Sequence, residues 1–148
     1  MQIYLDTNVF VVAVEGEETD VRSAIWRLFA AGASKGAALV TSELSMAELL
    51  VKPLQLELNA LAAIYSDLLS DGDGFAMVPV SRDILIRAAH IRKDDKAIKL
   101  PDAIHLATAD HSGCSAFLTG DKQIASKRQT LCRSLSIDSL DALAQEIA

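Results

Sequence analysis

Short apolar runs alternate along the chain with longer segments in which apolar residues recur at helical spacing. The runs typical of buried strands are residues 3–5, 38–41, 75–80, 115–118 and 135–137. Strands joined by intervening helices favour parallel pairing, with helices packed on both faces of the sheet. The pattern therefore predicts an α/β fold with a central, mainly parallel sheet, formed by residues 1–148 as a single domain.

The expected helices are placed by capping residues and prolines. A helix that begins near Ser42 is expected to end before Pro53, because the residue ahead of a proline disfavours helical geometry. Pro53 then suits the first turn of a helix running to about Leu69. Thr19 or Asp20 and, later, Ser81 are expected to cap two further helices. In the helix after Ser81, the residues expected to face inward are Ile84, Leu85, Ala88 and Ile91.

Composition narrows the class of protein. The chain has 148 residues, is 51% hydrophobic and has a mean hydropathy of +0.26. No apolar run approaches the roughly 18 residues of a membrane span, and the expected strand at residue 3 leaves no room for a signal peptide. We therefore expect a cytoplasmic protein with no membrane partner, whose surplus apolar surface is a helical face buried against a second copy or a partner.

The net charge of −6 argues against a nucleic-acid partner, but the charges are unevenly distributed. Residues 82–133 hold ten Lys and Arg against six Asp and Glu, whereas the rest of the chain holds four against 14. One half of the chain can therefore face a phosphate backbone, although solvated helix faces explain the same charges.

Four acidic residues from separate segments are expected to converge. Asp6 and Asp121 directly follow expected strands, and ligand sites of open α/β sheets lie beyond the carboxyl ends of the strands. Asp102 shares a helix face with apolar residues, and Glu48 lies between apolar neighbours. Each acid separately has a structural explanation: a turn, a helix cap, a favourable helix dipole, or a capping box of Ser45 with Glu48.

Taken together, these acids indicate a metal site. Carboxylates crowded in one cleft repel one another until a cation offsets their charge, and hard oxygen ligands select Mg²⁺ or Mn²⁺. Such an ion supports phosphodiester hydrolysis by activated water. The sequence offers no competing nucleophile elbow or glycine-rich phosphate loop, and its two cysteines share no metal-binding spacing with the histidines.

The segments around the four acids resemble the four acidic motifs of the PIN-domain family, and most closely those of VapC-type toxins from bacterial toxin–antitoxin pairs. The motifs are Ile-Tyr-Leu-Asp6-Thr-Asn-Val, Ser-x-x-x-Ala-Glu48, Pro-Asp102-Ala-Ile-His-Leu-Ala-Thr-Ala and Leu-Thr-Gly-Asp121-Lys. The resemblance implies a three-layer α/β/α sandwich and a Mg²⁺- or Mn²⁺-dependent endoribonuclease that acts as a toxin. It also implies an RNA substrate, a homodimer and a small antitoxin that blocks the site.

By position, Asp6, Asp102 and Asp121 resemble the family's metal ligands, and Glu48 resembles the acid that orients water or a second ion. Thr7, Asn8 and Thr119 resemble the polar residues that support the acids or contact substrate. Ile124 departs from the pattern, because relatives often carry an aromatic residue after the fourth acid. The alternative is a PIN-like binding or assembly module with little or no nuclease activity, whose acids are occupied by a partner's arginines.

Overall fold

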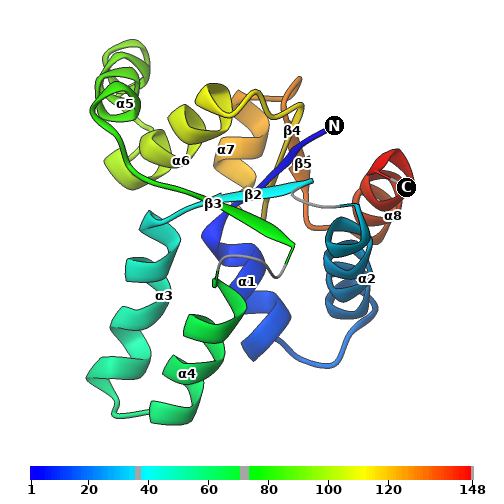
Figure 1. Ribbon diagram of the computed structural model, residues 1–148. Coiled ribbons are helices and arrows are strands. Elements are labelled where there is room, and N and C mark those ends of the chain that lie inside the picture. The colour runs from blue at the N-terminus through cyan, green and yellow to red at the C-terminus, as the bar shows by residue number, and fades with distance from the viewer. Residues whose placement is uncertain (36–37, 71–73, 148) are drawn as a thin grey trace.

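The centre of the molecule is a parallel sheet, five-stranded within residues 1–35, 38–70 and 74–147, which this computed structural model describes (Figure 1). Its strand order is β3-β2-β1-β4-β5, and every neighbouring pair is parallel. The parallel sheet expected from the sequence is confirmed. The strands are β1 (Ile3–Leu5), β2 (Leu39–Ser42), β3 (Phe75–Val78), β4 (Ala116–Thr119) and β5 (Cys132–Ser134).

Helices cover both faces of this sheet, which confirms the three-layer α/β/α sandwich. One hydrophobic core lies under α1, α2 and α8, and the other lies under α5, α6 and α7, while α3 and α4 pack side by side (Figure 1). No helix in the described ranges is long and apolar enough to cross a membrane. The helices are α1 (Thr7–Glu15), α2 (Asp20–Ser34), α3 (Leu44–Gln55), α4 (Asn59–Leu68), α5 (Arg82–Asp94), α6 (Leu100–His111), α7 (Lys122–Lys127) and α8 (Ile137–Ile147).

Strand β1 is fully buried because it lies between β2 and β4. Ile3 and Leu5 pack into one core, and Tyr4 points into the other, where its ring stacks on Phe117 with centroids 4.9 Å apart. The chain moves outward from β1 through β2 to β3 and then returns to place β4 on the opposite side of β1. Ligand sites of such sheets lie at this change of direction, beyond the carboxyl ends of the strands. The residues that follow β1 and β4 therefore occupy the expected position of a site.

The two predicted helix caps are confirmed. The Thr19 hydroxyl accepts a hydrogen bond from the backbone N–H of Arg22 at the start of α2. The Ser81 hydroxyl accepts one from the N–H of Ile84 at the start of α5. Each cap satisfies a backbone donor that the first turn of a helix leaves unpaired.

The predicted helix boundary at Pro53 is wrong. Helix α3 continues through Pro53 to Gln55, and α4 begins only at Asn59. Pro53 is buried in the last turn of α3, and its carbonyl accepts a hydrogen bond from the N–H of Leu58 at 2.8 Å. The restriction that proline places on the preceding residue is a preference, and burial of the ring outweighs it here.

The predicted last strand is also displaced. The structure places β5 at Cys132–Ser134 instead of residues 135–137, and α8 begins at Ile137. β5 is an edge strand in which only Cys132 is buried, so it lacks the apolar run on which the prediction depended. Leu135 instead packs its side chain against the core without joining the sheet.

One residue of α5 is exposed although it was predicted to face inward. Leu85 is 46% exposed, whereas Ile84, Ala88 and Ile91 are buried as expected. The three buried residues are spaced by four and three, and Leu85 lies about 100° around the helix from Ile84. Strand β3 likewise ends at Val78, two residues before its predicted end.

Candidate active site

Asp6 connects the end of the central strand to the first helix. It caps the N-terminus of α1 and is only 5% exposed. Its Oδ1 accepts a hydrogen bond from the N–H of Thr7 at 2.8 Å, and its Oδ2 accepts bonds from Asn8 Nδ2 at 3.1 Å and from Thr119 Oγ1 at 2.7 Å. These donors and the positive end of the helix stabilise a buried negative charge.

Thr119 and Asn8 join the ends of β1 and β4. Thr119 Oγ1 donates to Asp6 and accepts a hydrogen bond from the N–H of Asp121 at 3.0 Å. Asn8 Oδ1 accepts a bond from the N–H of Gly120 at 2.8 Å. A Cβ at Gly120 would lie 3.1 Å from Leu135 and 3.4 Å from Asn8 Oδ1, so the backbone here runs close to both side chains. Asn8 and Thr119 therefore lie beside Asp6 and hydrogen-bond to its carboxylate.

Asp121 caps the N-terminus of α7, which is one of the structural explanations considered for the four acids. Its Oδ1 accepts hydrogen bonds from the N–H groups of Gln123 at 2.8 Å and Ile124 at 3.3 Å. Among the described residues, its Oδ2 has no hydrogen-bond partner. Capping therefore occupies half of the carboxylate and leaves one oxygen for other contacts.

Asp102 lies in the first turn of α6 and is the least compensated of the four acids. Its side chain is half-buried and makes no hydrogen bond or ion pair with any other described residue. Burial raises the pKa of its carboxyl, and the charges of Asp6, Asp121 and Glu48 raise it further. The structure therefore brings the other three predicted acids within electrostatic range of Asp102.

Glu48 projects from α3 toward the same site and is held by one oxygen. Its Oε1 accepts hydrogen bonds from His105 Nε2 at 2.5 Å and Thr7 Oγ1 at 2.9 Å. Burial raises the pKa of Glu48, but the hydrogen bonds and charge of His105, together with the Thr7 bond, outweigh it and leave the pKa below its usual range. Glu48 is therefore ionised at neutral pH.

The alternative role of Glu48 in a capping box with Ser45 is not realised. Ser45 Oγ is buried and contacts Thr7 Oγ1 at 2.9 Å and Thr41 Oγ1 at 3.1 Å instead. Thr41 in turn donates to the carbonyl of Leu5 at 2.9 Å, the last residue of β1. These hydroxyl groups fix α3 against the end of β1 and so bring Glu48 to the site.

His105 is the site residue that sequence reasoning missed. It stands in the motif around Asp102 and had no role assigned to it, yet it is 1% exposed and contacts Tyr4, Thr7 and Glu48. It follows Asp102 by three residues, so both side chains lie on one helix face. A polar residue within the apolar run Ala-Ile-His-Leu-Ala was the available signal, because a buried imidazole needs partners.

The side chains at this site are oxygen donors suited to a hard cation. Among the described residues, no three His, Cys, Asp or Glu side chains form a group that could hold a metal ion. Mg²⁺ does not require such a cage, since one or two carboxylates commonly bind it while several waters complete its octahedron. The unpaired carboxylate of Asp102 and the free oxygen of Asp121 fit that requirement.

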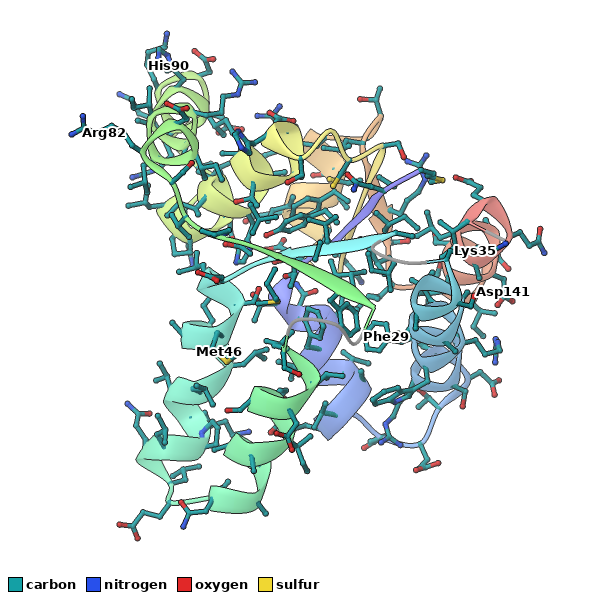
Figure 2. All side chains as sticks on the ribbon, in the orientation of Figure 1. Phe29, Lys35, Met46, Arg82, His90 and Asp141 are labelled. Carbon is teal, nitrogen blue, oxygen red and sulfur yellow. The ribbon has the colours of Figure 1, made fainter. Side chains whose placement is uncertain are left out.

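Two lysines lie beside the acids. Lys99 and Lys127 line a small cavity together with Asp102 and Asp121. Lys127 also donates to both oxygens of Asp95, at 3.0 and 2.8 Å. Within this basic half of the chain, Arg82 projects outward from α5 (Figure 2). Positive groups therefore adjoin the acidic site and cover part of the outer surface.

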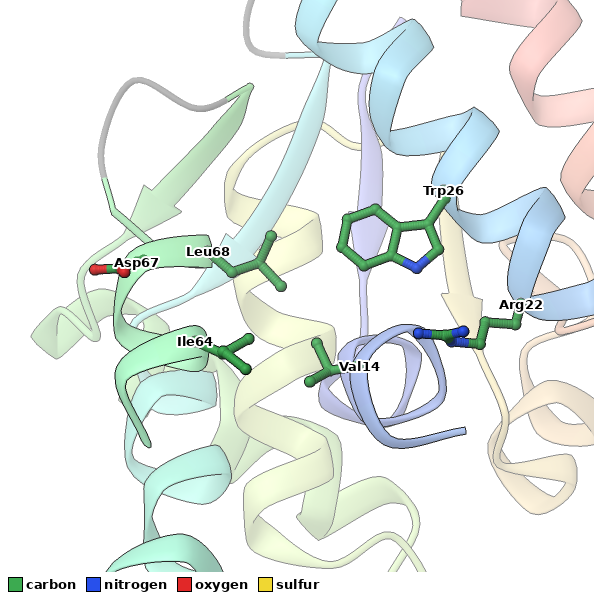
Figure 3. A pocket seen from close by; sticks show the side chains of 6 residues that line it. All are labelled: Val14, Arg22, Trp26, Ile64, Asp67 and Leu68. Carbon is green, nitrogen blue, oxygen red and sulfur yellow. The ribbon is translucent and has the colours of Figure 1, made fainter. Parts of the chain in front are cut away.

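A larger cavity, of about 480 Å³, lies away from the acids between α1, α2 and α4 (Figure 3). The indole of Trp26 borders it and donates to the carbonyl of Ala13 at 2.9 Å. It contains none of the four acids, so its size does not make it the centre of the chemistry. Its lining residues are Val14, Arg22, Trp26, Ile64, Asp67 and Leu68.

The sequence of the chain matches the model of a known protein family. The sequence model of the PIN domain matches residues 3–129. No protein of curated function matches the chain significantly.

Several solved structures share the fold. A toxin–antitoxin complex from Klebsiella pneumoniae is 20% identical, with a TM-score of 0.67 over 91% of this chain and 98% of the other. VapBC2 from Rickettsia felis, bound to a promoter DNA fragment, is 13% identical, with a TM-score of 0.71 over 90% and 98%. VapC20 from Mycobacterium tuberculosis, a toxin that cleaves the sarcin–ricin loop, is 19% identical, with a TM-score of 0.64 over 85% and 95%.

Proposed function

The chain belongs to the PIN-domain family, and we propose that it is a metal-dependent endoribonuclease acting as the toxin of a type II toxin–antitoxin pair. The observation that carries this proposal is the state of Asp102. Its half-buried carboxylate has no hydrogen-bond partner among the described residues, and its pKa is raised first by burial and then by three neighbouring carboxylates. Such an arrangement destabilises the protein by itself and is relieved when a cation binds.

Asp6, Asp102 and Asp121 are the residues that we propose to hold the ion, which is Mg²⁺ or Mn²⁺ by the hardness of the oxygen donors. Because the three do not form a closed group of ligands, waters of the ion would complete the contacts. When bound, such an ion lowers the pKa of coordinated water and offsets negative charge at a phosphodiester. Asp6 is held rigidly by Thr119 and Asn8, so it presents its charge in one orientation. Ligands fixed by surrounding hydrogen bonds bind metal more tightly than mobile ones.

Glu48 has a different proposed role, because its Oε1 is already occupied by two donors. Its Oε2 is free of partners among the described residues and is available to orient a water molecule. The lowered pKa of Glu48 keeps this carboxylate ionised, so this oxygen can accept a hydrogen bond from that water.

RNA is the proposed substrate, and Lys99 and Lys127 support this proposal by their position. Both line the cavity that also contains Asp102 and Asp121. Phosphate backbones bind lysine and arginine clusters, so positive groups beside the acids offset the repulsion between an acidic site and a polyanion. Such an enzyme would meet its RNA in the cytoplasm, which is the location we propose.

An antitoxin and a second copy of the chain are the proposed protein partners. The antitoxin would insert an arginine or lysine that competes with the metal for the same carboxylates. Two solved structures of this fold, 20% and 13% identical, come from a toxin–antitoxin complex and from VapBC2, which supports such a partner without identifying it. Exposed apolar residues on the end of α3 and on the segment after it, such as Leu54 and Leu56, offer surface for a homodimer contact.

Cleavage of labelled tRNA and ribosomal RNA fragments tests the proposal. The wild-type protein is expected to cut RNA with Mg²⁺ or Mn²⁺ and to lose activity in EDTA. Asp6→Asn and Asp102→Asn are expected to remove activity while keeping the fold, because each removes a ligand charge and keeps the shape. Activity that is indifferent to EDTA would refute the mechanism, and no cleavage of any RNA at saturating Mn²⁺ would favour a binding or assembly module.

A further inference from the structure

His105 connects three elements that meet at the candidate active site. It lies in the middle of α6, and its imidazole contacts Tyr4 of β1, Thr7 of α1 and Glu48 of α3. Its side chain is 1% exposed, and its contact with Tyr4 is fully buried. A buried imidazole with these three partners is held in one orientation.

The direction of the hydrogen bond between His105 and Glu48 is fixed by the carboxylate. The Glu48 carboxylate accepts only, so the His105 Nε2 that lies 2.5 Å from it must carry a proton. Tyr4 is fully buried, and its hydroxyl, which can donate or accept, lies 2.6 Å from His105 Nδ1. Both ring nitrogens are therefore hydrogen-bonded.

The opposite tautomer would not satisfy these contacts. With the proton on Nδ1 alone, Nε2 would present a lone pair to an ionised carboxylate oxygen. The contact between Nε2 and Glu48 Oε1 would then be repulsive, at a distance typical of a short hydrogen bond. The contact with Glu48 therefore requires a proton on Nε2, while Tyr4 holds the other ring nitrogen.

The Glu48 side chain is 35% exposed, so it has rotational freedom unless a partner holds it. His105 and Thr7 both contact Oε1, and Oε2 has no partner among the described residues. We propose that His105 is a positioning residue, oriented by Tyr4, that holds Glu48 by one oxygen and directs the other toward the acidic site. This inference rests on the proposed nuclease function, because it assigns a reason for the orientation of Glu48.

Three variants separate positioning from general support of the fold. His105→Gln retains a hydrogen-bond donor near the position of Nε2. The double variant Tyr4→Phe with His105→Leu removes both buried polar groups together, so the Tyr4 hydroxyl is not left without a partner. His111→Gln is the matched control, because His111 is an exposed histidine of the same helix.

The double variant is expected to lower kcat about 10–100-fold with little change in KM, as loss of a supporting hydrogen bond does. His105→Gln is expected to recover part of that loss, and His111→Gln is expected to match the wild type. A double variant with wild-type kcat would overturn the inference. So would a double variant that loses activity only through a raised KM.

The proton on His105 gives a test that does not depend on activity. Long-range ¹H–¹⁵N correlation spectra of the full chain identify the protonated ring nitrogen, and His105→Gln assigns the signal by its disappearance. A proton on Nε2, with a signal that shifts in Glu48→Gln, is the expected result, whereas an Nε2 without a proton would overturn the contact. An inactive wild-type protein would count against the proposed nuclease, while these spectra would still decide the role of His105 toward Glu48.

Discussion

Thr119 is expected to be the most sensitive hydroxyl in the molecule, because three polar groups depend on it. Its Oγ1 donates to Asp6 Oδ2 at 2.7 Å and accepts from the N–H of Asp121 at 3.0 Å and from Asn8 Nδ2 at 3.3 Å. The side chain is 1% exposed, so water cannot replace these partners. Thr119→Val keeps the shape and removes only the hydroxyl.

The expected loss follows from these contacts. A hydrogen bond to a charged group contributes about 1.5–3 kcal/mol, and an unpaired buried donor costs about 1–3 kcal/mol. Asp6 retains hydrogen bonds from Thr7 and Asn8, which limits the total. We therefore expect Thr119→Val to lower the free energy of unfolding by about 2–4 kcal/mol.

Urea unfolding at neutral pH measures this loss, and Thr108→Val provides the control. Thr108 is equally buried, but its hydroxyl donates only to the carbonyl of Ile104 within α6, at 2.7 Å. Its loss is expected to cost about 0–1 kcal/mol, because that carbonyl also accepts the helical backbone bond. Thr119→Ser, which keeps the hydroxyl, is expected to recover most of the stability. Equal stability of the two valine variants would refute the role assigned to Thr119.

Three further perturbations test other parts of the structure. In EDTA, Asp102→Asn is expected to raise the melting temperature at pH 7, because burial and neighbouring carboxylates raise the pKa of Asp102 in the folded protein. This gain should vanish below pH 3.8, the ordinary Asp pKa, where Asp102 is protonated in both the folded and the unfolded protein. Tyr65→Phe removes the 2.5 Å hydrogen bond that the Tyr65 hydroxyl donates to Glu15, a bond that lowers the pKa of Glu15. This loss is expected to lower the free energy of unfolding by about 1.5–3 kcal/mol. The full loss is expected above pH 4.5, and it should shrink as the pH falls through the lowered pKa of Glu15 in the folded protein. Gly113→Ala is expected to lower stability by about 1–2 kcal/mol, because alanine is strained at φ +66°. Gly74→Ala is expected to lower stability more, because its φ is also positive (+93°) and its Cβ would lie 2.7 Å from the backbone of α2.

Each of these expectations has a contrary result. A metal-free Asp102→Asn protein that melts below the wild type at pH 7 would contradict the repulsion between the acids. A pH-independent cost of Tyr65→Phe would show that its hydroxyl is not coupled to the charge of Glu15. Equal losses in the two glycine variants would show that close approach to α2 is unimportant.

The sheet could be predicted because its inner strands are apolar on both faces. Ile3 to Leu5 and Ala116 to Leu118 are buried throughout, so their sequences stand out as uninterrupted apolar runs. β5 could not be placed in the same way, because an edge strand needs little apolar surface and its position depends on pairing with β4. Pro53 shows a related limit, since a local backbone preference did not reveal that the ring would be buried.

The acids of the site could be predicted for a physical reason. Asp6 and Asp121 follow buried strands, and parallel neighbouring strands end at the same edge of a sheet. The network through Tyr4, His105 and Glu48 could not be predicted from the residues alone. Its members are far apart in the sequence, and their contact depends on the packing of α3 and α6 around β1.

Binding of Mn²⁺ tests most directly whether the acids share a divalent ion. Mn²⁺ is titrated into the metal-free wild type, Asp102→Asn and Asp110→Asn, and binding is measured by isothermal calorimetry or by the electron paramagnetic resonance signal of free Mn²⁺. Asp110 serves as the control because it lies at the far end of α6 and pairs with Arg87. The account predicts binding by the wild type and by Asp110→Asn, with affinity at least about tenfold weaker in Asp102→Asn. Equal affinity in all three proteins, or no binding by the wild type, would contradict it.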